Sequence, residues 1–139
     1  MPTSKKRSVT AEDLYSLQQL SNVSISPDGG RVAYRIQRVD RKTEKKYGNL
    51  WVVPSGGGEP RQFTYGNQSD YSPSWSPDGK YAAFSYSDHP NGTPTKLWRF
   101  DPSNNTWTSL AEFPYIDPPF WSPDGTWIAF RSQDGLGSE

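Results

Sequence analysis

The sequence contains no cysteine and only one histidine, His89. Without cysteine, the chain forms neither disulfide bonds nor thiolate metal sites. A hydrolytic triad needs a nucleophile, a base and an orienting acid, but His89 lies beside a proline in a turn-rich segment that predicts an exposed turn residue. A Gly-x-Ser-x-Gly nucleophile elbow is missing from the sequence as well. We therefore expect no catalytic residue, no cofactor and no metal site in this chain.

Long apolar runs are absent, and no apolar signal core follows the charged start at 1–7. A membrane helix needs about 20 apolar residues and a secretory signal needs an apolar core, so we expect a cytoplasmic location and no membrane partner. The net charge is zero, yet residues 1–46 hold ten Lys and Arg against five Asp and Glu. Much of this excess lies in 38–46, where interspersed acids and the lack of stacking aromatics predict a solvated loop with no nucleic-acid partner.

What the sequence does contain is a repeat. Ser-Pro-Asp-Gly occurs at 26–29, 76–79 and 122–125, in steps of 50 and 46 residues. Ile25, Trp75 or Trp121 precedes each copy, and a short apolar pattern follows each, at 32–34, 82–84 and 128–130. A third element of the repeat occurs at 50–53 and at 97–100, and a fourth occurs at 60–64 and at 107–110. Three copies in register with their flanking segments indicate a repeated structural unit.

Each Ser-Pro-Asp-Gly copy predicts a tight turn between two strands. Proline fixes φ, aspartate accepts a hydrogen bond from the backbone that follows, and glycine supplies a positive φ. This role explains Asp28, Asp78 and Asp124, which lie tens of residues apart and lack the clustered oxygen ligands of a Ca²⁺ loop. The copy at 122–127 is also similar to the Asp-box of sialidase propellers, but its glycine comes one position early. We interpret all three aspartates as turn residues.

The repeat predicts an all-β fold that is a partial β-propeller. Four antiparallel strands in roughly 40–50 residues are typical of a propeller blade, and strands with one bulky and one small apolar face suit a sheet packed between neighbouring sheets. We expect about two and a half blades within 21–139: blade 1 at about 21–64, blade 2 at about 70–110 and half of a third blade at about 117–131. A capping box at Thr10–Asp13 predicts a helix at 10–20, after a disordered segment at 1–9.

The aromatic residues of the first two copies are the candidate core. We expect five of them to be buried between consecutive blades: Tyr34, Trp51, Trp75, Phe84 and Trp98. Large aromatic side chains supply much of the apolar area that such short strands can bury. The aromatic residues of the third copy, Trp121, Trp127 and Phe130, should be less well covered.

Several stretches resemble the opening of prolyl oligopeptidase family serine peptidases. They are Thr10-Ala-Glu-Asp-Leu-Tyr15, Val23–Tyr34, Asn49–Pro54, Gly58–Thr64 and Ser74–Lys80. The resemblance points to the acylaminoacyl-peptidase and dipeptidyl-aminopeptidase branch and covers about residues 9–131. TolB-like propellers share the Ser-Pro-Asp-Gly repeat, but the helix directly ahead of blade 1 favours the peptidases.

This resemblance implies a function for the chain as one part of an enzyme. In that family the propeller has seven or eight blades, restricts entry to small peptides, and caps a C-terminal α/β-hydrolase domain that holds the Ser-Asp-His triad. We therefore expect an N-terminal fragment that serves as gate and scaffold, with the missing hydrolase domain as its partner and peptides as substrates of the intact enzyme. We also expect self-association through the open blade edge.

Two alternatives to the peptidase interpretation stay open. One is a fragment of a TolB-like or other non-enzymatic propeller that binds proteins. The other is a degenerate repeat protein without activity.

Overall fold

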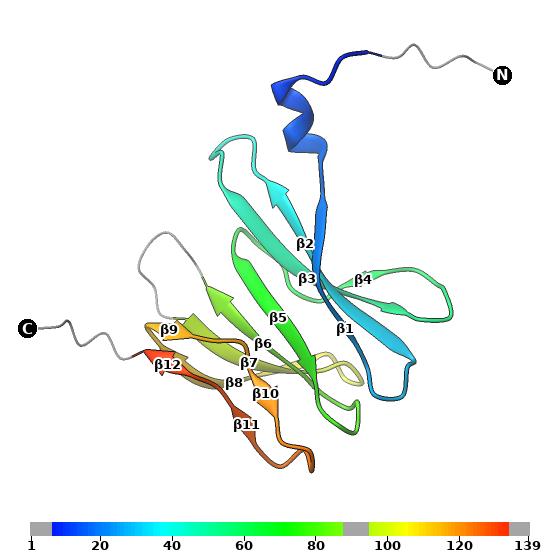
Figure 1. The fold of residues 1–139 in the computed structure, drawn as a ribbon, viewed down its shortest axis with the longest axis vertical. Coiled ribbons are helices and arrows are strands. Elements are labelled where there is room, and N and C mark those ends of the chain that lie inside the picture. Colours follow the sequence, from blue (N-terminus) through cyan, green and yellow to red (C-terminus); the bar gives the residue numbers. More distant parts are fainter. Residues whose placement is uncertain (1–6, 88–94, 134–139) are drawn as a thin grey trace, which may run out of the picture.

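The regular secondary structure of the described residues consists almost entirely of β-strands (Figure 1). The computed structural model describes residues 7–87 and 95–133. Within these residues the elements are η1 (Ala11–Ser16), β1 (Gln19–Ile25), β2 (Arg31–Val39), β3 (Lys46–Pro54), β4 (Arg61–Gln62), β5 (Ser69–Trp75), β6 (Ala82–Ser87), β7 (Thr95–Asp101), β8 (Thr106–Phe113), β9 (Tyr115–Ile116), β10 (Phe120–Trp121), β11 (Ile128–Ala129) and β12 (Ser132–Gln133). No helix in this described part is long and apolar enough to cross a membrane. The expected all-β class is confirmed.

Strands β1 to β4 form an antiparallel meander, here called blade 1. β1 pairs with β2, β2 pairs with β3 along its whole length, and the two residues of β4 pair with Trp51 and Val52 of β3. The charged loop between β2 and β3 is largely exposed, as its sequence predicts. Blade 1 thus has a long inner part and a very short outer strand.

Strands β5 to β8 repeat the meander as blade 2. The first strand of each blade contains a β-bulge, seen as a register shift in β1 and again in β5. Asn22 and Ser72 occupy equivalent places in the two bulges, each with φ of 50°, which is uncommon for a residue other than glycine. A bulge bends its strand and increases its twist, so both blades are shaped by a feature that their apolar pattern did not reveal.

Strands β9 to β12 form the third unit, which is made of two-residue strands. β10 pairs with β11 across the third Ser-Pro-Asp-Gly turn, and β9 pairs with β12. Trp127 is 75 % exposed, and Trp121 and Phe130 are only partly buried. As expected, Trp121 and Phe130 are less well covered than Trp75 and Phe84, which occupy the same positions in blade 2.

The main core lies between blade 1 and blade 2. Its buried residues are Leu50, Phe63, Phe84 and Phe100, and a second cluster joins Ala33, Trp75 and Ala82. Of the five expected core aromatics, Tyr34, Trp75 and Phe84 are buried, whereas Trp51 and Trp98 are only half-buried. Phe63 and Phe100 lie in the centre instead, with their rings stacked at 5.0 Å between centroids.

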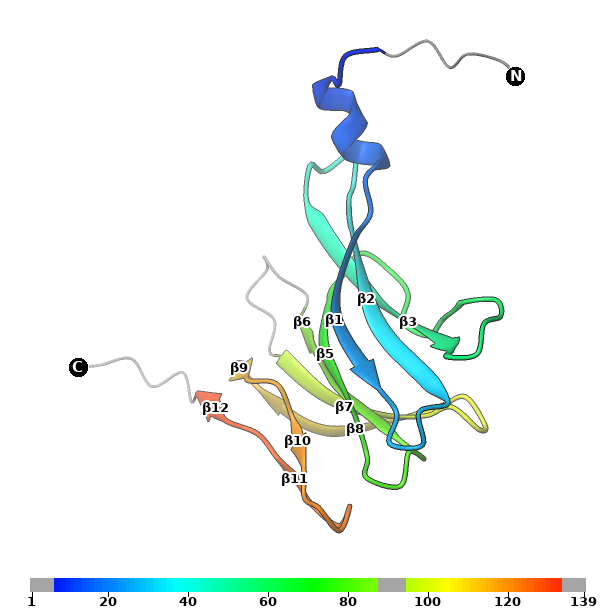
Figure 2. The same ribbon diagram turned by 45° about the vertical axis from the view of Figure 1, so that its right-hand side comes forward.

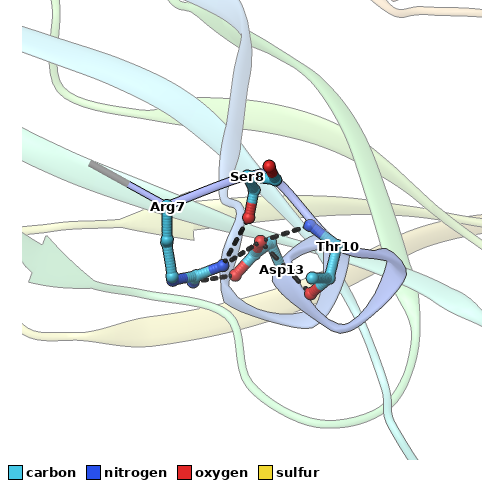
Figure 3. A network of polar contacts seen from close by, with 4 residues as sticks. All are labelled: Arg7, Ser8, Thr10 and Asp13. Carbon is cyan, nitrogen blue, oxygen red and sulfur yellow. Dashed lines mark hydrogen bonds and ion pairs between the residues drawn. The ribbon is translucent and has the colours of Figure 1, made fainter. Parts of the chain in front are cut away.

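The N-terminal helix is shorter than expected. η1 is a six-residue 3₁₀ helix at 11–16, and the chain is already in β1 from Gln19. The cap is present, because the Asp13 carboxylate accepts a hydrogen bond from the Thr10 N–H at 2.7 Å and binds the Arg7 guanidinium (Figure 3). These contacts hold the pKa of Asp13 down at about 2, the contact with Arg7 being the larger cause.

The helix stops early because its apolar side chains find little to pack against. Leu14 and Leu17 are both more than half exposed, and so is Leu20, which already belongs to β1. Most helical stability in proteins comes from packing an apolar face. A helix at 10–20 is therefore not formed, although a cap for one is present.

The two ends of the blade array differ. Figures 1 and 2 show the three Ser-Pro-Asp-Gly turns, which follow β1, β5 and β10, gathered at one end, and η1 at the opposite end beside the loop that joins β2 and β3. The blades are therefore stacked with the same orientation, and equivalent residues of successive blades face one another.

Candidate functional site

The three Ser-Pro-Asp-Gly turns have the same internal hydrogen bonds. In each turn the serine Oγ donates to the aspartate Oδ1 at 2.6 Å, and that carboxylate accepts a backbone N–H two residues further on at 3.0–3.1 Å. These contacts, led by the serine hydroxyl, lower the pKa of Asp28, Asp78 and Asp124. The glycines have φ of 70–72°. The turn role that the sequence predicts for these aspartates is confirmed.

The serine has a second task that the sequence did not reveal. Its Oγ accepts the backbone N–H of the residue five positions later, which is Arg31, Tyr81 or Trp127, at 2.9–3.0 Å. Each turn is thus closed by its own side chains. The described residues contain no group of three His, Cys, Asp or Glu side chains placed to hold a metal ion.

Successive turns are linked by a ladder of tryptophan hydrogen bonds. The Trp75 Nε1–H of blade 2 donates to the Ser24 carbonyl of blade 1 at 3.1 Å, and the Trp121 Nε1–H of the third unit donates to the Ser74 carbonyl of blade 2 at 3.0 Å. The turns also pack directly, since a Cβ on Gly79 would lie 3.7 Å from Pro27. The tryptophans before the turns therefore join one blade to the next.

A buried polar cluster lies at the interface of blades 1 and 2. The Arg35 Nε–H donates to the backbone carbonyl of Asp70 at 2.9 Å, and its guanidinium lies 5.1 Å from the centre of the Tyr71 ring. Burial lowers the pKa of Arg35. Gly48 makes room for this side chain, because a Cβ there would lie 2.2 Å from the guanidinium. The cluster thus fixes how blade 2 sits on blade 1.

Asp70 is the most unusual member of this cluster. Its side chain is fully buried, and the Asn49 amide donates to its Oδ2 at 3.4 Å. Oδ1 has no well-formed hydrogen bond within the described residues. Burial raises the pKa of Asp70 to about 6, although Thr64, Asn49 and Gln68 act in the opposite direction. A carboxyl group with such a pKa is a candidate for a functional role.

Asp70 contributes to the wall of a pocket of about 430 Å³ between the two blades. Six aromatic residues form much of the remaining wall, together with Lys96: Phe63, Tyr65, Phe84, Tyr86, Trp98 and Trp107. This size is in the range of small-molecule sites, which combine apolar walls with a few polar groups. The sequence predicts Phe84 and Trp98 only as core residues, and no pattern in it points to Asp70.

The absence of catalytic residues stays a prediction. The one histidine, His89, lies outside the described residues, and the described part brings together no serine, histidine and acid. What the structure does assemble is a pair of stacked four-stranded meanders with a third, smaller unit. Stacked antiparallel blades in a common orientation define a β-propeller portion.

The sequence relatives of the chain are peptidases. It is 31 % identical over 110 residues to the uncharacterized peptidase YuxL of Bacillus subtilis, a match that covers 79 % of this chain and 16 % of the relative. It is 34 % identical over 76 residues to dipeptidyl-peptidase 5 of Porphyromonas gingivalis, covering 55 % and 11 %. The chain thus spans only 11–16 % of the length of these curated relatives. No family model matches the sequence.

The solved structures that it resembles include a β-propeller domain and a putative TolB. The β-propeller domain of the trilobed protease from Pyrococcus furiosus matches with a TM-score of 0.67 and 21 % identity, covering 81 % of this chain and 33 % of that one. A putative TolB from Agrobacterium tumefaciens matches with a TM-score of 0.58 and 30 % identity, covering 80 % and 37 %. The chain is therefore a β-propeller portion related in sequence to peptidases, and the resemblance seen in the sequence is confirmed at this level.

Proposed function

We propose that the chain supplies consecutive N-terminal blades of a propeller that gates and scaffolds the α/β-hydrolase domain of a serine peptidase. The observation that carries the proposal is the repeated blade-to-blade stacking in a chain whose sequence relatives are peptidases. In this proposal the hydrolase domain is the partner and supplies the triad, while the blades exclude large substrates. A cytoplasmic location is part of the same proposal.

The blades have a property that suits a rigid gate. The interface of blades 1 and 2 is held by apolar packing, a tryptophan hydrogen bond, closely packed turns and the Arg35 and Asp70 cluster. Rigid elements position functional groups more reliably than loops do. Such blades can narrow the way to a catalytic centre without moving.

A graft into a related enzyme tests this function. The segment of dipeptidyl-peptidase 5 that matches this chain is replaced by the corresponding residues of the chain, and cleavage of a chromogenic dipeptidyl substrate and of casein is measured. We expect the graft to cleave the small substrate and to spare casein, and the parent enzyme is measured in parallel as the reference. The same graft with Phe84→Ala, which disrupts the interface core, should lose this exclusion or fail to fold.

A folded graft that cleaves casein freely, while the parent enzyme does not, would refute the gating role. The second candidate function is a TolB-like propeller that binds proteins and has no enzymatic partner. It is supported by the 30 % identity to the putative TolB, and a folded graft without any dipeptidyl cleavage would favour it.

A further inference from the structure

The pocket between blades 1 and 2 exists because the outer strand of blade 1 is short. β4 has two residues, whereas its counterpart β8 has eight. After β4 the chain turns inward, so that Phe63 enters the core and the Thr64 hydroxyl accepts the Leu50 N–H at 2.7 Å. The outer half of blade 2, with Trp98 and Trp107, is therefore left without a covering strand from blade 1.

The walls of this pocket are aromatic. Trp107 stacks on Phe63 with 6.1 Å between ring centres and meets Phe84 edge-on at 5.7 Å. Trp107 remains partly exposed, as does Trp98 in the neighbouring strand. Aromatic faces carry partial negative charge and attract cations, tryptophan most strongly. The walls thus suit a flat apolar group, a cation, or a ligand that combines the two.

The carboxylate of Asp70 is not required by the fold. The β1–β2, β5–β6 and β9–β12 pairings place Leu20, Asp70 and Ile116 at equivalent positions in the three units. An apolar residue is thus compatible with this position in the other two copies. A buried carboxylate with an unpaired oxygen is costly, and its presence in the unit that has the pocket indicates a hydrogen-bond donor supplied from outside.

The Asp70 carboxylate forms no ion pair within the described residues, although the Arg35 charge lies near enough to act on it. Arg35 donates to the backbone carbonyl of Asp70, and no salt bridge to the side chain is found in the part of the chain that the structure describes. Lys96, the cation in the wall, is paired with Glu112 at 3.3 Å. A ligand that brings its own ammonium group would satisfy Asp70.

We propose that the pocket binds a small organic amine, in which an aryl body lies against Trp98 and Trp107 and a primary ammonium group donates to Asp70. This site is independent of the proposed gating role, because it lies in the interface between two blades and needs no hydrolase domain.

The probe is 2-phenylethylammonium, and its matched control is the neutral 2-phenylethanol. Both are titrated into the chain while the indole N–H signals of its tryptophans are followed by NMR, with assignments from single Trp→Phe variants. We expect the ammonium probe to bind at least about tenfold more tightly than the alcohol, a difference of about 1.4 kcal/mol. The shifts should be largest at Trp98 and Trp107 and small at Trp121.

Asp70→Asn should abolish the preference for the ammonium probe and leave binding of the alcohol largely unchanged. Asp70→Leu, which copies the residue of blade 1, provides the same test if the amide variant does not fold. Equal affinity of the two probes for the unaltered chain would overturn the proposal without any variant. So would shifts centred away from Trp98 and Trp107, or an undiminished ammonium preference in a folded Asp70 variant.

Discussion

Truncation of Phe84 tests whether the contact between blades 1 and 2 holds the chain together. Phe84 is 2 % exposed in β6, and its ring meets Phe63 edge-on with 6.0 Å between ring centres. Removing a core phenylalanine costs about 3–5 kcal/mol, through lost apolar burial and the cavity left behind. A domain of ordinary stability has only about 5–15 kcal/mol in total. Phe84→Ala should therefore remove a large part of the free energy of unfolding.

Phe130 provides the matched control, since it occupies the same position in the third unit. It is only partly buried and contacts Phe113 at 5.7 Å between ring centres, so Phe130→Ala should cost about 1–2 kcal/mol. Urea unfolding at 25 °C, followed by far-ultraviolet circular dichroism, measures both values. Equal losses at the two sites would refute the reasoning, because they would mean that the third unit is packed as tightly as the interface of blades 1 and 2.

Four further predictions follow from single contacts. Trp75→Phe keeps a ring but removes the indole N–H, and should lower the free energy of unfolding by about 1 kcal/mol in urea titrations; no loss would show that the ladder is not stabilising. Gly48→Ala should destabilise by about 2 kcal/mol or more, because its Cβ meets the buried guanidinium, whereas Gly56→Ala, with open space around it, should be nearly neutral. The pKa of Asp70 is higher in the folded than in the unfolded state, so the folded state binds more protons. The free energy of unfolding should therefore fall by about 3 kcal/mol as the pH rises from about 4 through 6. Asp70→Asn should flatten this part of the pH profile, and an unchanged profile would contradict the raised pKa of Asp70. The isolated chain should associate through its exposed apolar side chains as its concentration rises, and a monomer at all concentrations in sedimentation would contradict this.

The turns were predictable from the sequence because their chemistry is local. Ser26, Asp28 and Gly29 lie within four residues of one another, and the hydrogen bonds that close the turn join atoms of the same short segment. Three copies of this segment also revealed the repeat and, through it, the blades. The repeat also predicted Phe84 and Trp75 as core residues, because their positions flank the turn and hold a large apolar or aromatic residue in every copy.

The pocket was not predictable because its parts come from distant segments. Phe63 follows β4, Asp70 is the second residue of β5, and Trp107 lies in β8, so no spacing in the sequence brings them together. The pocket exists because β4 is short, and the length of a strand depends on the partners with which it pairs in space. The predicted helix at 10–20 was wrong for the same reason. Its cap depends only on nearby residues, but its leucines would have needed a surface from a distant part of the chain to pack against.

The ladder of tryptophans gives the stack of blades a direction. The three turns have the same internal geometry, so turn packing alone would not distinguish one order of blades from another. Each indole N–H, however, reaches back to a carbonyl of the preceding unit, while Ile25, the equivalent residue of blade 1, has no side-chain donor. Blade 1 can therefore accept this hydrogen bond but cannot donate it, and exchanging the first two units would leave a ladder carbonyl without its partner. The residue before the turn thus distinguishes blade 1, which only accepts this hydrogen bond, from the two units that follow it, which each donate one.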